Sequence, residues 1–341
     1  LHRLIRRQRQ MCIRDRNKDM TNHLILKILH KIASKFHTSK LQKEELHYIN
    51  DANLAAKNIV NLLLSEKPCM IARFGSIELT VIVRYLGMLK YKSKYMSYIL
   101  GETPNWWWEK NLMKSIQNNA GFINPTPENL KKFSVRMMED MQLVDILGSW
   151  CKEELLFKAE LNNALKVRLR YLEPFWGDSP WTKALKDKKV LIIHPFAETV
   201  MKQYEKREFL FKNSDTLPKF KSLQVIKAVQ SIGGNSEYKD WFEALHSMEL
   251  EMNKADYEVC LIGCGAYGFP LAAHAKRTGH KAIHLGGALQ LLFGIAGKRW
   301  FDKDNTAIYE TYKDLLNEYW VYPSKSEKPK GANSVEGGCY W

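Results

Sequence analysis

Apolar residues along the chain gather in short runs that polar and glycine-rich stretches separate. Seven of these runs have the length of buried strands, and they cover residues 69–72, 144–147, 167–172, 190–193, 223–228, 257–262 and 281–285. Helices are predicted between many of them. Strands that alternate with helices form a parallel sheet that is covered on both faces. We therefore predict an α/β protein with a Rossmann-like, mostly parallel sheet and helices on both faces.

The helices are predicted from apolar residues at helical spacing. They cover 41–64, 77–86, 239–253, 270–277 and 288–293, and two more are predicted from Glu198 onward and around Trp106–Trp108. Another helix should begin after Thr126, because threonine is a good N-cap and Pro127 suits the first helical position.

Breaks in this pattern divide the chain into four predicted parts. Residues 20–66 form an N-terminal helical region, residues 67–322 the α/β domain, and residues 323–341 a polar C-terminal tail. The tail ends in aromatic residues, which predicts that it docks back on the body of the protein. Residues 1–16 contain MCIRDR and resemble a translated sequencing-library adapter, so we predict that they are not native.

The charge balance of the chain favours anionic partners. The formal net charge is +15, and it is +10 once residues 1–16, with their six Arg and one Asp, are set aside. Such a charge attracts nucleotides, phospholipid surfaces or nucleic acids, but the basic residues are spread along the chain without an RNA-binding motif, so we expect no nucleic acid. No apolar run approaches the roughly 18 residues of a membrane span. Without a leader or a CxxC pair, a cytoplasmic location is expected.

The helix predicted within 20–36 has an apolar face and a basic face. Its apolar residues are Ile25, Ile28, Leu29, Ile32 and Phe36, and its basic stripe is Lys27, Lys31 and Lys35. One interpretation is a helix that packs on the domain with its basic face in solvent. The other is a peripheral contact with an anionic membrane.

A glycine-rich loop follows the strand predicted at 257–262. It reads GxGxxG, and its candidate ligand-binding residues are Gly263, Gly265, Tyr267 and Gly268. Glycines allow a tight turn and a close backbone approach, and a helix N-terminus attracts a diphosphate; a tight turn without a ligand is the alternative. A dinucleotide site would also have an acid roughly 20 residues further on. The next acid is Asp302, which counts against NAD.

Two other strand ends carry candidate ligand contacts. Gly286 and Gly287 follow the last predicted strand, and Gln290 lies one turn into the next helix. Because ligands sit at the carboxyl ends of parallel strands, we expect these residues to line the same crevice, with a plain turn as the alternative. His194 ends the strand predicted at 190–193, where it could contact a phosphate, transfer a proton or be purely structural.

The first strand–helix junction carries Arg73, Gly75, Ser76 and Glu78. Arginine suits bidentate contact with phosphate, so Arg73, Gly75 and Ser76 are expected to bind the ligand. Glu78 could hold a hard metal such as Mg²⁺ or Mn²⁺. In the alternative, Ser76 caps the helix and Glu78 interacts with its positive end.

Four stretches resemble one protein family. They are IARFGSIEL, VLIIHPF, the block from LIGCGAYG to GKRW, and VEGGCYW, and over roughly 55–341 the chain resembles the bacterial GT-D-fold glycosyltransferases. The resemblance implies a GT-D-like catalytic domain, a nucleotide-sugar donor, a divalent metal and a role in surface polysaccharide or glycan synthesis. Arg73, Phe74, Gly75 and Glu78 match the RFG-Asp-x-Glu motif of that family, whereas Ser76 stands where Asp is expected and leaves Glu78 as the sole carboxylate.

We therefore expect a cytoplasmic glycosyltransferase that uses a nucleotide-sugar, most simply a UDP-sugar, and a glycan or lipid-linked acceptor. Glu78 and His194 are the expected catalytic residues, and Glu78 is also the expected metal ligand. Two alternatives remain open. One is a Rossmann enzyme that uses NAD or S-adenosylmethionine at the same glycine loop, and the other is a nucleotide-binding protein without turnover.

Overall fold

A computed structural model describes residues 23–37, 43–231, 236–328, 332 and 338–341. The predicted adapter segment 1–16 lies outside these residues. The chain divides into two compact units, which we describe separately. Among the described residues, the smaller unit takes those up to Glu45 together with Val83–Trp107, and the larger takes those within Leu46–Ile82 and Trp108–Trp341. This division differs from the predicted boundary after residue 66, because residues 46–66 join the sheet and 83–107 join the N-terminal helix.

The larger unit is built on a seven-stranded sheet with the order β3-β2-β1-β7-β6-β4-β5. Its strands are β1 (Cys69–Arg73), β2 (Ile146–Ser149), β3 (Leu165–Arg168), β4 (Lys189–His194), β5 (Ser222–Lys227), β6 (Val259–Ile262) and β7 (Lys281–His284). Every neighbouring pair is parallel. Each of the seven strands overlaps a predicted one, and the predicted Rossmann-like α/β fold is confirmed. The overlap is smallest at β3, because residues 169–172 of the strand predicted at 167–172 form a 3-10 helix. A further strand was expected to end at Asn124, and that prediction is wrong because the residues before Asn124 form a loop.

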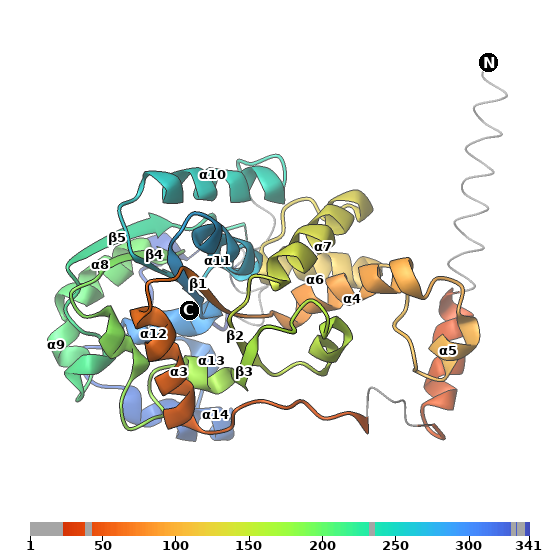
Figure 1. Ribbon diagram of the computed structural model, residues 1–341, viewed down its shortest axis with the longest axis horizontal. Helices are drawn as coiled ribbons and strands as arrows, with labels where there is room; N and C mark the ends of the chain where they lie inside the picture. The colour runs from red at the N-terminus through yellow and green to blue at the C-terminus, as the bar shows by residue number, and fades with distance from the viewer. Residues whose placement is uncertain (1–22, 38–42, 232–235, 329–331, 333–337) are drawn as a thin grey trace, which may run out of the picture. The chain divides into compact units, whose positions relative to one another are not determined.

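Helices cover both faces of this sheet. The helices of the larger unit are α3 (Ala52–Leu64), α6 (Lys110–Ala120), α7 (Pro127–Met141), α8 (Ala197–Glu205), α9 (Arg207–Leu210), α10 (Trp241–Lys254), α11 (Gly268–Arg277), α12 (Leu289–Leu292), α13 (Lys298–Phe301) and α14 (Thr306–Tyr312). α4 (Ser76–Lys90) begins in the larger unit and ends in the smaller one, which also contains α5 (Tyr95–Ile99). α11 packs on β1, β6 and β7, with α7 and α10 beside it, whereas α3 packs against β1 from the other face. Figure 1 shows α10 and α11 on one side of the sheet and α3 and α12 on the other.

Two predicted helices differ from the observed structure. The helix predicted over 41–64 begins only at Ala52, where the Asp51 carboxylate accepts a hydrogen bond from the Leu54 amide at 2.8 Å. The stretch before it is extended, and Ile49 forms a parallel bridge to Val167. The helix predicted around Trp106–Trp108 is also wrong, because these residues lie in the loop between α5 and α6. In contrast, Thr126 caps α7 as predicted, with Pro127 at the helix start.

The strand order places a crevice at one edge of the sheet. β4 and β6 are neighbours, but the chain leaves β4 toward β5 at the sheet's end and leaves β6 toward β7 in the opposite direction. Loops that diverge from adjacent parallel strands open a crevice at the carboxyl ends of those strands. His194 ends β4 and Gly263 follows β6, so two of the predicted site segments flank this crevice.

In the smaller unit, the N-terminal helix covers residues 23–33. Its buried face carries Leu26, which packs in a cluster with Tyr98 and Trp106. His23 stacks on Trp107, and Nδ1 of His30 lies 2.9 Å from the Tyr98 carbonyl oxygen. The isoleucine face is exposed in this unit. Both interpretations of the helix remain predictions.

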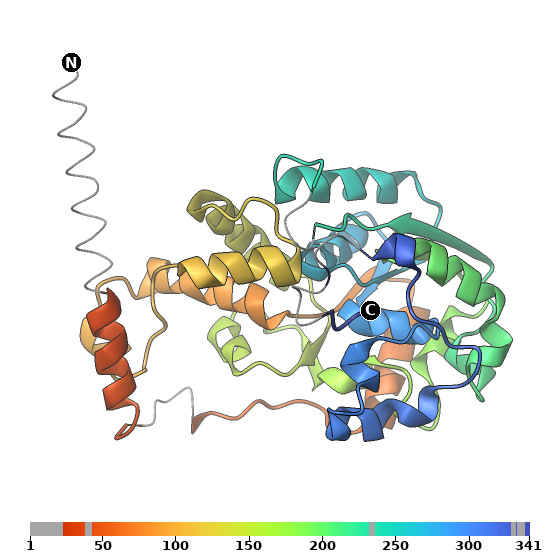
Figure 2. The ribbon, with the colours of Figure 1, turned by 180° about the vertical axis from the view of Figure 1, so that it is seen from behind.

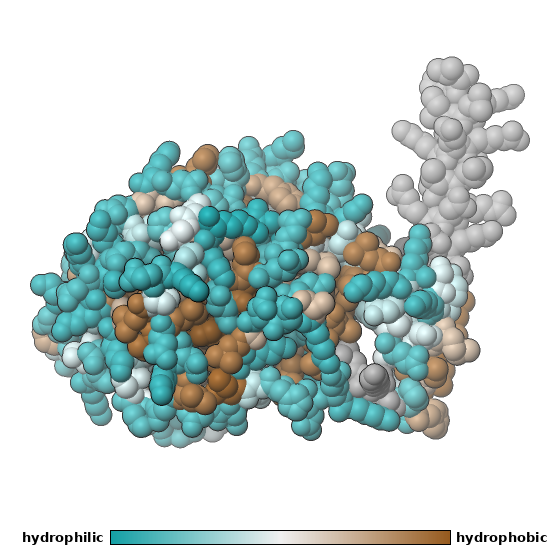
Figure 3. All heavy atoms as spheres, in the orientation of Figure 1, coloured by the Kyte–Doolittle hydropathy of each residue, from teal (hydrophilic) through white to brown (hydrophobic). Residues whose placement is uncertain are grey.

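Apolar side chains of the isoleucine face lie at the surface of the smaller unit. They are Leu24, Ile25, Ile28, Leu29, Ile32 and Phe36, each at least 41% exposed. Hydrophobic residues are visible over this helix in Figure 3. In the described part of the chain, no helix has both the length and the apolarity that crossing a bilayer requires.

Candidate functional site

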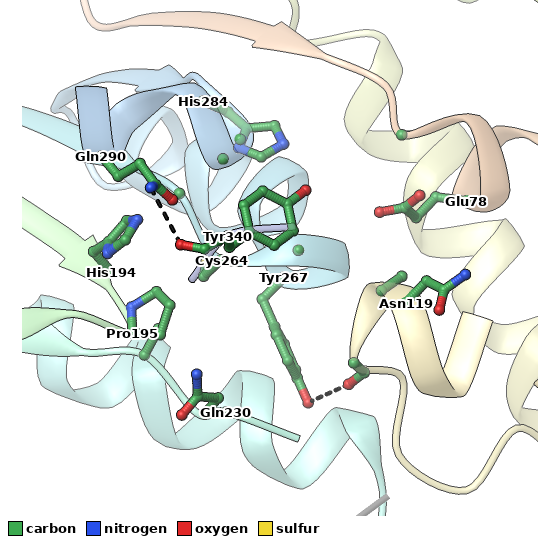
Figure 4. A pocket seen from close by; sticks show the side chains of 18 of the residues that line it. Glu78, Asn119, His194, Pro195, Gln230, Cys264, Tyr267, His284, Gln290 and Tyr340 are labelled. Atoms are coloured by element: carbon green, nitrogen blue, oxygen red, sulfur yellow. Dashed lines mark hydrogen bonds between the residues drawn. The ribbon is translucent and has the colours of Figure 1, made fainter. Parts of the chain in front are cut away.

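A cleft in the larger unit lies at the carboxyl edge of the sheet and has a volume of about 140 Å³. The segments after β1, β4, β6 and β7 all line it, as the sequence predicted, and so does the segment after β5. Figure 4 shows His194 and Gln290 on one wall of the cleft, with Glu78 and Asn119 on the opposite wall. Each residue predicted as a site residue lines the cleft, except Gly268, which lies just behind it in α11.

Arg73 is held in the cleft by an aromatic neighbour. Its guanidinium carbon lies 5.3 Å from the centre of the Trp150 ring, and the Trp150 indole N–H donates to the Phe74 carbonyl at 3.0 Å. Trp150 is itself fixed by Glu154, a fully buried carboxylate that accepts the backbone amides of Trp150 and Cys151, both at 3.0 Å. Burial lowers the pKa of Arg73, while Glu78 opposes this change. The guanidinium remains charged at neutral pH, so it is a fixed cation in the cleft.

Glu78 lies in the first turn of α4 and folds back over Gly75. A Cβ atom on Gly75 would lie 1.9 Å from Oε2 of Glu78, so the absence of a side chain at position 75 gives the carboxylate its place. Ser76 begins α4 and also lines the cleft. The predicted juxtaposition of Arg73, Gly75, Ser76 and Glu78 is therefore observed, and Glu78 acts electrostatically on Arg73.

The glycines of the GxGxxG loop are required by contacts within the protein. Gly265 has φ +57°, and a Cβ there would lie 2.6 Å from the Ala120 carbonyl oxygen. A Cβ on Gly268 would lie 2.1 Å from the ring of His284, and one on Gly263 would lie 2.6 Å from the Gly286 carbonyl oxygen. These contacts explain the three glycines by themselves, without the close phosphate approach that the sequence pattern predicted. Gly263 and Gly265 still line the cleft.

Tyr267 connects the glycine loop to the opposite wall. Its hydroxyl donates to the Gly121 carbonyl at 3.2 Å and lies 3.1 Å from Ser231 Oγ, as the dashed line to Gly121 marks in Figure 4. The side chain is 1% exposed, and burial raises its pKa. These contacts favour a positioning role for Tyr267, because its hydroxyl is already engaged within the protein.

His194 is neutral and has a defined tautomer. The Phe196 amide donates to Nδ1 at 3.0 Å, so the ring proton is on Nε2. Burial lowers the pKa of His194 to about 3, because the imidazolium would lose its hydration. Of the two predicted chemical roles, this arrangement favours hydrogen-bond donation to a ligand over proton uptake at neutral pH.

His284 is a cleft residue that the sequence prediction missed. It ends β7 as His194 ends β4, and that shared position at a strand end is the signal that would have found it. Nδ1 lies 3.3 Å from the Ile262 carbonyl oxygen, which assigns the proton to Nδ1 and leaves Nε2 as an acceptor. Burial, aided by Arg73, lowers its pKa to about 3. The cleft therefore presents two neutral histidines of opposite tautomer.

The C-terminal tail forms part of the cleft, which confirms that it docks back on the body. Tyr340 and Trp341 line the cleft, and the C-terminus lies against the larger unit in Figures 1 and 2. A Cβ on Gly287 would lie 2.3 Å from the Tyr340 ring, so Gly287 makes room for the tail. Gly286 has φ +61°, and a Cβ there would lie 3.5 Å from a guanidinium nitrogen of Arg73.

Arg299 is a second cation that the sequence prediction missed. It donates to the Tyr340 hydroxyl at 2.7 Å and lines the same cleft as Arg73. Arg299 does not directly follow a predicted strand, so nothing in the sequence indicated that it lines the cleft. Its contact with Tyr340 of the docked tail shows this. Together Arg73 and Arg299 supply two positive charges, and Glu78 supplies one negative charge.

The chemistry of these side chains limits how a metal could bind. In the described part of the chain, no three His, Cys, Asp or Glu side chains come together as a metal-binding group. Glu78 is the acidic residue among those that line the cleft. It fits Mg²⁺ or Mn²⁺ only as a single protein ligand, with phosphate oxygens and water in the other positions, a coordination that Mg²⁺ accepts. The metal site at Glu78 remains a prediction.

The site as a whole has the features of an anion-binding crevice: two guanidinium groups, a histidine N–H and a helix beginning at the glycine loop, all at the carboxyl ends of parallel strands. Comparison with known proteins adds no identity to these features. No family model, no curated protein and no solved structure matches this chain.

Proposed function

We propose that this protein is a glycosyltransferase that takes its sugar from a nucleotide-sugar, most simply a UDP-sugar. The observation that carries the proposal is the convergence of Arg73, Arg299 and the Nε2–H group of His194 on one cleft at the carboxyl edge of the sheet. A diphosphate needs this combination of charge and directed donors. Sugar transfer itself is proposed from the sequence resemblance to GT-D-fold enzymes.

The cleft would promote transfer by stabilising the leaving diphosphate. In the reaction, the bond between the sugar C1 and the phosphate oxygen breaks, and the nucleoside diphosphate leaves with the bonding electrons. An acceptor hydroxyl forms the new bond to C1, and its proton passes to the departing diphosphate, directly or through water. Fixed positive charge near the phosphates favours this step because it acts where negative charge develops. Mg²⁺ or Mn²⁺ held by Glu78 would add charge at the same place.

We also propose that the N-terminal helix contacts an anionic membrane surface. Its exposed isoleucine face and its lysine stripe, Lys27, Lys31 and Lys35, are the two features of an interfacial helix. This contact would suit a lipid-linked acceptor in glycan synthesis. It concerns the smaller unit by itself and does not depend on the cleft.

Ligand binding tests the proposed donor. We expect UDP and UDP-glucose to raise the melting temperature of the purified protein, because a ligand present at about 100 times its Kd stabilises a fold by roughly 2.7 kcal/mol. NAD and S-adenosylmethionine should have no effect. A shift with NAD or S-adenosylmethionine and none with any UDP-sugar would assign the cleft to the alternative class of Rossmann enzyme.

Turnover tests the catalytic assignment. Release of UDP from a panel of UDP-sugars, measured with MnCl₂ and with EDTA, should fall by about 100-fold or more in Glu78→Gln, in line with the loss of one electrostatic group in an active site. Thermal unfolding should change little, because a dipole interaction in the first turn contributes only about 0.3–1 kcal/mol. Full activity with unchanged metal dependence in this variant would make Glu78 structural.

A further inference from the structure

Gln290 carries a buried oxygen that has no partner in the cleft. Its side chain is 1% exposed. Its Nε2 group faces the carbonyl oxygens of Ile295 at 3.2 Å and Tyr340 at 3.4 Å. Among the described residues, Oε1 of Gln290 forms no hydrogen bond, and Gln290 lines the cleft. Buried acceptors are almost always paired, so this one indicates a missing donor.

The orientation of the Gln290 amide is fixed by its surroundings. If the amide were flipped, Oε1 would face two carbonyl oxygens, which cannot donate. Gly297 packs closely beside this contact, since a Cβ there would lie 2.8 Å from Nε2 of Gln290 and 3.0 Å from the Tyr340 carbonyl oxygen. Figure 4 shows the Gln290 amide beside Tyr340 on the wall that carries His194. Oε1 is therefore a preorganised acceptor.

Two other buried polar atoms of the cleft also lack a hydrogen-bond partner among the described residues. They are Nε1 of Trp341 and Nε2 of Gln230, and both residues line the cleft. The three groups are neutral, whereas the phosphate-directed groups Arg73 and Arg299 are charged. The cleft thus contains neutral polar groups in addition to its two cations.

We propose that Gln290 Oε1 accepts a hydrogen bond from a neutral N–H or O–H group of the nucleoside portion of the bound nucleotide-sugar, so that Gln290 is a specificity residue of the donor site. This inference rests on the proposed function. In a uridine nucleotide two kinds of group offer the required donor: the imide N3–H of the base and the hydroxyls of the ribose. A carboxylate or phosphate, which only accepts, cannot satisfy Oε1.

Binding of UDP analogues to paired variants tests this assignment. Calorimetry would compare UDP with N3-methyl-UDP, 2′-deoxy-UDP and 3′-deoxy-UDP on the wild type and on Gln290→Met. The matched control is Gln203→Met. Gln203 is 2% exposed and also donates from Nε2 to two carbonyl oxygens, those of Gly294 and Tyr319, but it lies outside the cleft.

We expect the wild type and Gln203→Met to bind one analogue at least 10-fold more weakly than UDP, and Gln290→Met to bind that analogue and UDP equally. A loss with N3-methyl-UDP identifies the base as the source of the donor, and a loss with a deoxy analogue identifies the ribose. Each comparison is the ratio of two affinities measured on the same variant. Any loss of tail docking that weakens the binding of all nucleotides equally therefore leaves this ratio unchanged.

Three results would overturn the assignment. Gln290→Met could keep the discrimination of the wild type, or the wild type could bind all four nucleotides equally; either result with normal UDP affinity rejects Gln290 alone and leaves the proposed function intact. If the folded wild type binds no UDP, the proposed UDP-sugar donor and the role of Gln290 both fail.

Discussion

The carboxylate of Glu78 occupies the space where a side chain on Gly75 would begin, since a Cβ at position 75 would lie 1.9 Å from Oε2 and 2.5 Å from Oε1 of Glu78. Gly75 is therefore a determinant of where the carboxylate points into the cleft. Its contribution does not come from a left-handed backbone conformation, because its φ lies outside the positive range.

Gly75→Ala should displace Glu78 while the fold is kept. We expect UDP release from a UDP-sugar to fall about 10- to 100-fold, because misplacing a catalytic group by about 1 Å can cost a factor of 100. The free energy of unfolding, measured by urea denaturation, should change by less than about 1 kcal/mol, because the neighbouring atoms belong to one side chain that can move. The double variant Gly75→Ala/Glu78→Gln should release UDP no more slowly than Glu78→Gln alone. If the two losses add instead, Gly75 does not act through Glu78.

Gly265→Ala should destabilise the protein more than it impairs ligand binding. The new methyl group would lie 2.6 Å from the Ala120 carbonyl oxygen, in addition to the cost of φ +57°. We expect a loss of at least about 2 kcal/mol in the free energy of unfolding. The control is Gly279→Ala, where φ is +88° but no atom lies within 4 Å of the added Cβ; it should lose about 1 kcal/mol. Equal losses in the two variants would show that the Ala120 contact is unimportant.

The two buried histidines should make folding sensitive to acid. The pKa values of His194 and His284 are lowered to about 3 by burial, whereas histidine in an unfolded chain has a pKa of about 6.5. Between these values the unfolded chain binds protons that the folded protein does not. The free energy of unfolding is therefore unaffected by these two residues above pH 6.5, and they lower it progressively as the pH falls from 6.5 toward 3. Burial raises the pKa of Glu173 to about 7, so this residue makes the protein more stable as the pH falls below 7. The histidine effect is therefore measured by comparing the wild type with a histidine variant at each pH.

His284→Gln should flatten this pH dependence. From pH 7 to pH 5, the stability of the wild type relative to the variant should fall by about 2 kcal/mol, as the two pKa values require. Urea denaturation at each pH measures it, and His246→Gln serves as the control because the His246 side chain is 69% exposed. If wild type and His284→Gln show parallel pH profiles, His284 is not a buried neutral histidine.

The N-terminal helix should bind anionic vesicles through its isoleucine face. We expect the protein to co-sediment with vesicles of phosphatidylglycerol and phosphatidylcholine, to bind phosphatidylcholine alone poorly, and to dissociate as salt screens the lysines. Ile28→Asp/Ile32→Asp should abolish binding, whereas Leu250→Asp, at a 45% exposed leucine of α10, should not. Unchanged sedimentation of the double variant would rule out this face as the contact.

The layered part of the structure could be predicted from the amino-acid pattern alone. Apolar runs predicted the five inner strands, because a strand buried on both faces must be apolar along its whole length. The edge strands β3 and β5 are largely exposed, and β3 overlaps its predicted run only at residues 167–168. Thr126 and Pro127 predicted the start of α7, because capping depends on neighbouring residues alone. The parallel arrangement then placed Arg73, His194, Gly263 and Gly286 at one edge, since all the strand ends of a parallel sheet with these connections point the same way.

Tertiary structure decided everything that depends on contacts between distant segments. The hydrophobic pattern of the N-terminal helix identified an apolar face but could not tell which face would be covered, and the structure covers the one with Leu26 and His30. The GxGxxG pattern could not distinguish glycines that admit a phosphate from glycines that admit the Ala120 carbonyl and the His284 ring. Arg299 and the unpaired oxygen of Gln290 emerge only with the docked tail, because burial and hydrogen-bond satisfaction are properties of the packed chain and have no periodic signature in its sequence.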